Sequence, residues 1–69
     1  MAITTDFGRA VRTAREAKGL SQEQLADLAN VHRTYLSGIE TGSRNPTLEV
    51  VDRLARALDV SPAALLEDR

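Results

Sequence analysis

The sequence predicts an all-α fold: a compact bundle of about five short helices in one domain over residues 1–69. Apolar residues recur at helical spacing along the chain, and residues that start or stop helices separate the apolar stretches. No segment alternates apolar and polar residues for long enough to form a strand. A domain of this size buries about 60% of the surface that its unfolded chain exposes, so we expect a thin stability margin.

The first helix is expected from Asp6 to Lys18, with Thr5 as its N-cap. Lys18 followed by Gly19 is typical of a helix end, because a cation suits the last turn and glycine suits the position after it. Four apolar residues at helical spacing should face the core: Phe7, Ala10, Val11 and Ala14.

The second helix should begin sharply and run from Gln22 to Ala29. Ser21 and Gln24 have the spacing of a capping box, in which each side chain accepts a hydrogen bond from the other residue's backbone N–H. Asn30 tolerates a left-handed backbone and should end the helix, while Val31 fills the turn. Ala26 is small enough for a close helix crossing. We expect three other apolar side chains of this helix to point inward: Leu25, Leu28 and Ala29.

The third helix should run from Arg33 to Glu40 and bury Leu36 and Ile39. Its other faces are polar, and it follows the second helix after a turn of only a few residues. Two short helices joined in this way, with the second one polar on its outer face, are typical of a helix-turn-helix. The sequence therefore predicts a helix-turn-helix core at about residues 21–41.

Two helices complete the predicted bundle. The fourth begins after Thr47 as N-cap and runs to about Leu58. Its apolar residues follow helical spacing: Leu48, Val51, Leu54, Ala55 and Leu58. The fifth has Ser61 as its cap and Pro62 in its first turn, where the missing N–H costs nothing, and it continues from Ala63 to Leu66.

The composition excludes several classes of function. The chain has no Cys and a single His, which rules out disulfides and leaves no ligand cluster for a metal. It has no Gly-rich phosphate loop and no evident acid/base pair, so we expect neither an enzyme nor a cofactor. It also lacks a membrane-length apolar run and a signal peptide, so the expected compartment is the cytoplasm.

The net charge of −1 is unusual for a nucleic-acid-binding domain, since such domains are often basic. The charge is unevenly distributed, because most basic residues lie within residues 1–45 and the remainder of the chain is acidic. Basic groups can gather on one face even when the total is near zero. The balance of charge therefore does not exclude DNA as a partner.

A set of residues runs through most of the chain: Arg15, Gly19, Leu20, Ser21, Gln22, Leu25, Ala26, Val31, Tyr35, Leu36, Ile39, Glu40, Gly42, Arg44, Asn45, Pro46 and Leu54. This pattern resembles the XRE-type family of phage-repressor and Cro-like helix-turn-helix regulators. The segments 33–40 and 43–45 are similar, more narrowly, to the controller proteins of restriction–modification systems. The resemblance implies a lambda-repressor-like fold and a transcriptional regulator that binds double-stranded DNA in a sequence-specific way.

In this family the third helix enters the major groove, and the second crosses the DNA backbone. The resemblance therefore implies base contacts from Arg33, Thr34 and Ser37, with Arg33 suited to bidentate contact with guanine. It implies contacts with the DNA backbone from four residues: Gln22, Tyr35, Arg44 and Asn45. Arg44 is also a candidate for a base contact.

Two further residues have alternative interpretations. Arg12 is either a phosphate contact at the rim or a solvated side chain. His32 either caps the third helix, which we favour, or contacts a phosphate. The family also suggests an ion pair between Arg15 and Glu40 that ties the first helix to the end of the third. Gly38 departs from the pattern, because many relatives have a longer base-reading side chain there.

The last part of the chain, residues 59–69, often pairs two subunits in relatives. The resemblance therefore implies a homodimer on a palindromic operator, with half-sites about 34–36 Å apart. The candidate contacts are apolar residues that could instead complete the core: Val60, Ala63, Leu65 and Leu66.

An alternative function is a protein-interaction module of antitoxin or bridging-factor type, which would use the polar third helix on a protein partner. The overall acidity favours this alternative slightly. The expected convergence of Gln22, Arg33, Arg44 and Asn45 on one face favours DNA, because this set suits phosphates better than a protein. No small-molecule ligand is expected.

Overall fold

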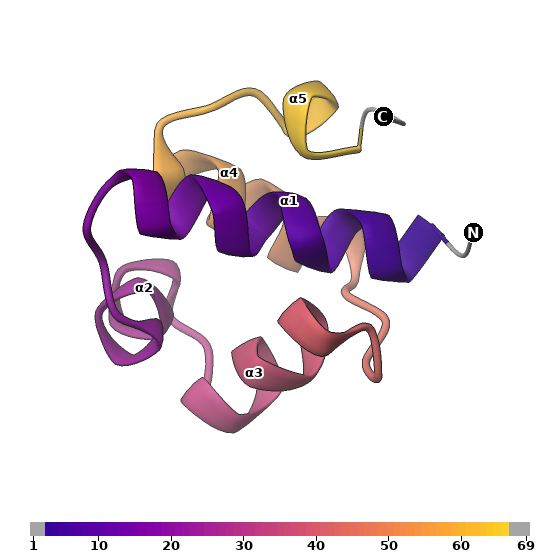
Figure 1. The fold of residues 1–69 in the computed structure, drawn as a ribbon, viewed down its shortest axis with the longest axis horizontal. Helices are drawn as coiled ribbons and strands as arrows, with labels where there is room; N and C mark the ends of the chain where they lie inside the picture. The colour runs from indigo at the N-terminus through magenta and orange to yellow at the C-terminus, as the bar shows by residue number, and fades with distance from the viewer. Residues whose placement is uncertain (1–2, 67–69) are drawn as a thin grey trace.

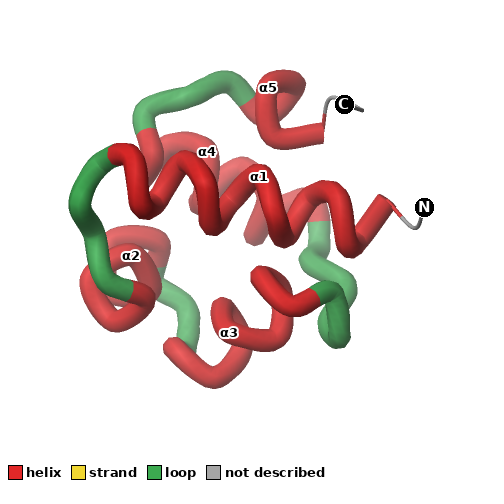
Figure 2. The backbone as a smooth tube through the Cα atoms, in the orientation of Figure 1, coloured by secondary structure: helices red, strands yellow, loops and turns green. Residues whose placement is uncertain are grey.

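A computed structural model describes residues 3–66, and the chain forms five helices within that range (Figures 1 and 2). Their bounds are α1 Ile3–Ala17, α2 Gln22–Ala29, α3 Arg33–Thr41, α4 Leu48–Leu58 and α5 Pro62–Leu66. No strand is present in this part of the chain. The all-α fold class predicted from the helical spacing is confirmed.

The polar caps set where α2, α4 and α5 begin. Ser21 Oγ accepts a hydrogen bond from Gln24 N at 3.0 Å, and Gln24 Oε1 accepts one from Ser21 N at 2.8 Å, so the predicted capping box is present. Thr47 Oγ1 accepts from Val50 N at 3.1 Å, and Ser61 Oγ accepts from Ala64 N at 3.2 Å. These caps satisfy N–H groups that have no partner inside their own helix.

The turn between α2 and α3 depends on Asn30, which adopts the left-handed conformation with a φ of 58°. Its N–H reaches back to the carbonyls of Ala26 and Asp27, which closes the last turn of α2. Val31 is half-buried against the core, as predicted for a residue that fills this turn.

Some predicted boundaries were wrong. Helix α1 begins at Ile3, so Thr5 lies inside the helix and is not its N-cap. A threonine followed by an acidic residue suits the first turn of a helix as well as the position before it, so the local signal did not separate the two. His32 does occupy the N-cap of α3, but its side chain makes no capping hydrogen bond.

The core is formed by one face of each helix. Its fully buried large side chains come from α1, α2, α3 and α4: Phe7, Val11, Leu25, Leu36, Ile39, Leu54 and Leu58. Leu28, which was predicted to face inward, is 61% exposed, and Leu48, which fits the helical spacing of α4, is 85% exposed. The buried faces of α2 and α4 are shifted around the helix axis, and they include Ala26 and Val50.

Helix α1 crosses the middle of the molecule, with α2 and α3 on one side of it and α5 on the other (Figure 1). It packs against α3, α4 and α5, while α2 packs against α3 and α4. The contact between α1 and α3 is close, because a Cβ added to Gly8 would overlap the carbonyl oxygen of Ile39 and lie 2.9 Å from that of Glu40. The core thus holds α3 firmly while leaving its far side free.

Candidate nucleic-acid interface

The outward side of α3 carries the three residues expected to contact bases. Arg33 and Thr34 are exposed, and Ser37 is half-buried. Residues 33 and 37 are one helical turn apart and residue 34 adjoins them, so the three share one face. Leu36, Ile39 and Glu40 are buried, and they anchor the helix to the core.

The segment after α3 folds back onto the end of that helix. Gly42 has a φ of 84°, and the backbone N–H groups of Ser43 and Arg44 donate to the carbonyl of Gly38 at 2.9 and 3.2 Å. The hydroxyls of Thr41 and Ser43 donate to the same oxygen at 3.2 and 3.3 Å. This set of contacts brings Arg44 and the adjoining Asn45 to the flank of α3.

Tyr35 fastens the same segment from a second point. Its hydroxyl donates to the carbonyl oxygen of Asn45 at 3.2 Å, and its ring is half-buried against the core. The side chain therefore packs against the body and also holds the loop. A phosphate contact would require the hydroxyl to donate to that phosphate in place of Asn45.

The start of α2 meets the end of α3 through a buried carboxylate. Glu40 accepts hydrogen bonds from Arg15 Nε at 2.8 Å, from Arg15 Nη2 at 3.0 Å and from Gln22 Nε2 at 3.1 Å. Arg15 also donates to the carbonyl of Leu20 at 2.9 Å. The ion pair implied by the resemblance is therefore present, and it also includes Gln22, which is half-buried beside it.

Burial makes this ion pair sensitive to loss of either partner. The Arg15 and Glu40 side chains are 11% and 2% exposed. Hydrogen bonding to Glu40 raises the pKa of Arg15 above its ordinary value, and coulombic attraction to Glu40 and Glu16 adds to the rise against the opposing effect of burial. These contacts favour the charged guanidinium, which arginine keeps in proteins in any case.

The arginines of the chain differ in their partners. Arg12, Arg53 and Arg56 each pair with an acid one turn away on the same helix, at 3.3, 3.0 and 2.9 Å. Arg33 and Arg44 have no ion-pair partner among the residues that the structure describes. Both are exposed. Positive charge on α3 and its following loop is therefore not neutralised locally, which suits a polyanionic ligand.

The two residues with alternative interpretations are also placed. Arg12 lies on α1 and is engaged with Glu16. His32 is exposed at the start of α3, next to Arg33, and its imidazole is not used for capping. The position of His32 beside the outward face of α3 is compatible with a phosphate contact.

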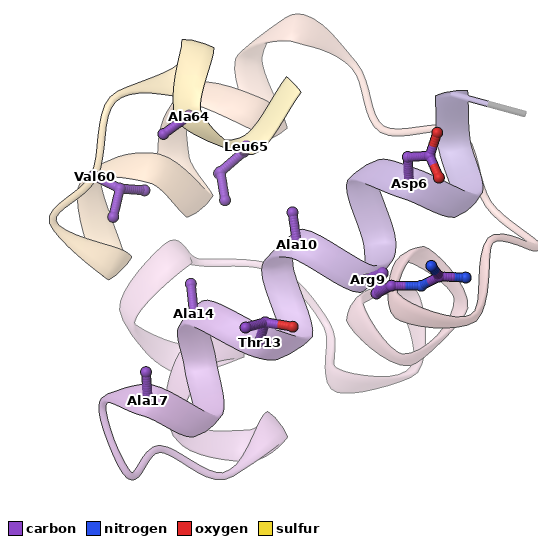
Figure 3. A pocket seen from close by; sticks show the side chains of 9 residues that line it. All are labelled: Asp6, Arg9, Ala10, Thr13, Ala14, Ala17, Val60, Ala64 and Leu65. Carbon is purple, nitrogen blue, oxygen red and sulfur yellow. The ribbon is translucent and has the colours of Figure 1, made fainter. Parts of the chain in front are cut away.

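On the other side of α1, a hollow of about 380 Å³ is lined by residues of α1, Val60 and α5 (Figure 3). Ala10, Ala14 and Ala17 point into it from α1, and Val60 and Ala64 face them. The small alanine side chains leave this space, and the hollow lies away from the outward face of α3.

Leu65 was a candidate for a dimer contact or, alternatively, for the core, and its burial favours the core. Leu65 is 3% exposed and points toward α1 in Figure 3, so it belongs to the core of its own chain. The other three candidates are exposed: Val60, Ala63 and Leu66. Residues 67–69 of the predicted pairing segment lie outside the described range.

The Helix-turn-helix family model matches residues 11–65, which include every element from α2 to α4 and the buried Arg15–Glu40 pair. The chain belongs to the XRE-type helix-turn-helix family. As a member of this family, it is a DNA-binding transcription regulator. Its relatives are regulators and not enzymes.

Similar proteins of this XRE-type family include controllers of restriction–modification systems. The control protein C.BamHI of Bacillus amyloliquefaciens is 45% identical over 62 residues, which cover 88% of this chain and 76% of that protein. The crystal structure of the restriction-modification controller protein C.AhdI from Aeromonas hydrophila matches with a TM-score of 0.88 and 47% identity, covering 90% of this chain and 94% of that one.

A further XRE-type similarity is to the biofilm master regulator SinR, solved in complex with DNA. The match has a TM-score of 0.85 and 35% identity, and it covers 88% of this chain and 98% of that one. Among the described residues of the present chain, no helix is long and apolar enough to cross a membrane. Residues 6–66 also hold no group of three metal-ligating side chains.

Sequence reasoning did not predict the contacts of two glycines that shape the surroundings of α3. Gly8 allows the backbone of α1 to approach the end of α3. Gly38 leaves room for the Arg44 side chain, and its carbonyl oxygen accepts hydrogen bonds from the loop that carries Arg44. Gly38 was noticed only as a missing side chain. The contacts of both glycines are made by residues far away in sequence or on the next loop, so helical spacing alone carried no signal for them.

Proposed function

We propose that the protein binds a palindromic DNA operator as a homodimer, with α3 of each subunit in the major groove of one half-site. The observation that carries this proposal is the outward face of α3, where two arginines without acidic partners flank small polar side chains. A groove-binding helix needs such a face because base edges offer hydrogen-bonding groups and the surrounding phosphates attract cations. In this proposal residues 21–41 form the helix-turn-helix core of the DNA-binding domain and residues 59–69 pair the subunits, in the cytoplasm where the operator lies.

Within the groove, Arg33 at the first position of α3 is suited to two parallel hydrogen bonds with one guanine. Thr34 and Ser37 are short and can contact base edges or a thymine methyl group. Four residues would contact phosphates in this proposal, namely Gln22, Tyr35, Arg44 and Asn45, with Gln22 helped by its place at the start of α2. His32 and Arg12 are outer candidates for the same backbone.

A second subunit is proposed because one recognition helix reads only a few base pairs. A two-fold symmetric pair adds an equal second half-site about 34–36 Å away, on the same side of the duplex. Val60, Ala63 and Leu66 support pairing at the end of the chain, because they are exposed and apolar. Burial of these residues against a second copy would remove apolar surface from water.

We further propose that the regulated genes are those of a restriction–modification system. The support is the similarity to C.BamHI and C.AhdI, which are named as control or controller proteins, at 45% and 47% identity. The segments 33–40 and 43–45, which include the proposed base-reading residues, carry the same resemblance.

Selection of bound duplexes from a random pool tests the proposal. We expect an enriched sequence with two inverted half-sites whose centres are separated by about one helical turn, or a multiple of it. An enriched sequence with a single unpaired half-site would contradict the homodimer. No enrichment at low ionic strength would contradict DNA binding by α3 and would favour a protein partner.

A further inference from the structure

Gly38 occupies a position on α3 where a side chain would reach the proposed DNA surface. It lies one turn along the helix from Thr34, a candidate base contact, so residues 34 and 38 are neighbours on the helix surface. A Cβ added to Gly38 would overlap Cγ of Arg44 and would lie 3.3 Å from Cβ of Arg44 and 3.3 Å from Oγ of Ser43. The aliphatic stem of Arg44 therefore crosses α3 at the place that a side chain at residue 38 would fill.

The backbone of Gly38 holds the same loop. Its carbonyl oxygen accepts the N–H groups of Ser43 and Arg44, and the hydroxyls of Thr41 and Ser43 also point at it. The stem and the backbone of Arg44 are thus both fixed against one residue. The guanidinium at the end of that stem has no acidic partner among residues 3–66, and Arg44 is exposed.

We propose that Gly38 is a positioning residue for DNA recognition, because its missing side chain lets Arg44 take a place on the recognition surface of α3. The chain thereby supplies from a loop the long side chain that the helix lacks at this position. This inference rests on the proposed function only for the contact that Arg44 then makes. The seating of Arg44 on Gly38 is independent of DNA.

The direction in which Gly38→Ala shifts the thermal midpoint distinguishes this role from that of an ordinary glycine in a helix. Alanine stabilises a helix interior more than glycine does. If the space beside Gly38 were empty, Gly38→Ala would therefore raise the midpoint of thermal unfolding. If Arg44 occupies the space, Gly38→Ala must displace its stem and should lower the midpoint instead. In an Arg44→Ala background the overlapping Cγ is gone, and the same substitution should lower the midpoint much less or raise it.

The experiment is a double-mutant cycle with four proteins: the wild type, Gly38→Ala, Arg44→Ala and the double variant. Each is measured for its thermal midpoint without DNA, and for its Kd on the selected duplex at several salt concentrations. We expect each single variant to weaken binding by roughly tenfold and to flatten the salt dependence equally, because both lose the same cationic contact. The double variant should bind no more weakly than Arg44→Ala alone.

Val51→Ala provides the matched control, since it removes core volume from α4 and leaves Gly38 and Arg44 unchanged. Measured below its own midpoint, it should unfold earlier but keep the wild-type affinity and salt dependence. If lower stability alone weakened binding, affinity and salt dependence would change in both Val51→Ala and Gly38→Ala. If displacement of Arg44 weakens binding, they change only in Gly38→Ala.

Several results would overturn the inference. One is a wild-type Kd for Gly38→Ala, and another is an unchanged Kd for Arg44→Ala. A third is a double variant whose loss of affinity equals the product of the two single losses. If Gly38→Ala fails to fold while the double variant folds, the seating of Arg44 is supported, and failure of both overturns it. If the wild type binds no duplex, the proposed function is contradicted. The thermal midpoints of the four proteins then still decide whether Arg44 packs against Gly38.

Discussion

Arg33 and Arg56 have the same side chain but different surroundings. Arg56 is paired with Asp52 one turn away on α4, whereas Arg33 stands exposed without an acidic partner among residues 3–66. The pairing of Arg56 leaves less of its charge for an external anion, and α4 is not the helix proposed to enter the groove. The two residues therefore allow a comparison in which the loss of charge is equal.

Arg33→Ala should weaken binding to the selected operator by about 1–3 kcal/mol and relax discrimination at one base pair in each half-site. The measurement is Kd on the operator and on duplexes changed at single positions. Arg56→Ala should leave both affinity and discrimination close to wild type. An equal loss for Arg33→Ala on operator and on random DNA would contradict the base-reading role.

A second residue-scale prediction compares two glutamates that each face an arginine. Glu40→Gln should destabilise folding by roughly 3 kcal/mol, at the lower end of the cost of breaking a buried pair, because Arg15 keeps 11% of its side-chain exposure. Glu16→Gln, in the exposed pair with Arg12, should cost less than about 1 kcal/mol. Urea denaturation measures both, and equal midpoints would show that burial does not govern the Arg15–Glu40 pair.

At the scale of elements, the sequence predicted helix ends better than helix faces. The starts of α2, α4 and α5 were correct because Ser21, Thr47 and Ser61 act locally, on N–H groups within a few residues. Leu28 fitted the helical spacing as well as Leu25 did, yet it is exposed. The packing partners of α2 decide which part of its apolar stripe is buried, and spacing within α2 does not contain them.

The leucine pair on α2 provides a direct test of this difference. Leu25→Ala removes a fully buried side chain and should cost about 2–5 kcal/mol, since the surrounding core cannot fill the cavity. Leu28→Ala, three residues along the same helix, should stay within about 0.5 kcal/mol of wild type. Chemical denaturation of both variants checks the prediction, and a large loss for Leu28→Ala would place that residue in an interface.

The candidate site divides in the same way. The residue types on the outer face of α3 could be predicted, because the family resemblance and the helical spacing both place Arg33, Thr34 and Ser37 together. The bond from Gln22 to Glu40 and the seating of Arg44 on Gly38 could not. They depend on where α2 and the following loop lie relative to α3, which no short stretch of sequence specifies.

At the scale of the whole molecule, the apolar residues at the chain end set the expected assembly. Leu66→Asp should give a folded monomer whose affinity for the palindromic operator falls, because the charged side chain cannot be buried against a second copy. Sedimentation measures the mass and circular dichroism the folding. Leu48→Asp, on an exposed leucine at the start of α4, is the matched control and should leave the mass unchanged.

An unchanged mass for Leu66→Asp would show that the subunits pair elsewhere. Leu65 is unsuitable for this test, because it is 3% exposed within its own chain and a charge there would disturb folding directly. A charge at exposed Leu66 therefore tests subunit pairing, whereas a charge at buried Leu65 would test folding.

The backbone contact at Gly8 limits how the protein can adapt to different operators. Because α1 meets the carbonyls of Ile39 and Glu40 without an intervening side chain, α3 cannot tilt or slide unless the first helix moves with it. Tolerance of imperfect half-sites must then come from side-chain rotation or from bending of the duplex. We therefore expect operators with stiff central sequences to be bound less tightly than flexible ones, even where no amino acid touches the centre.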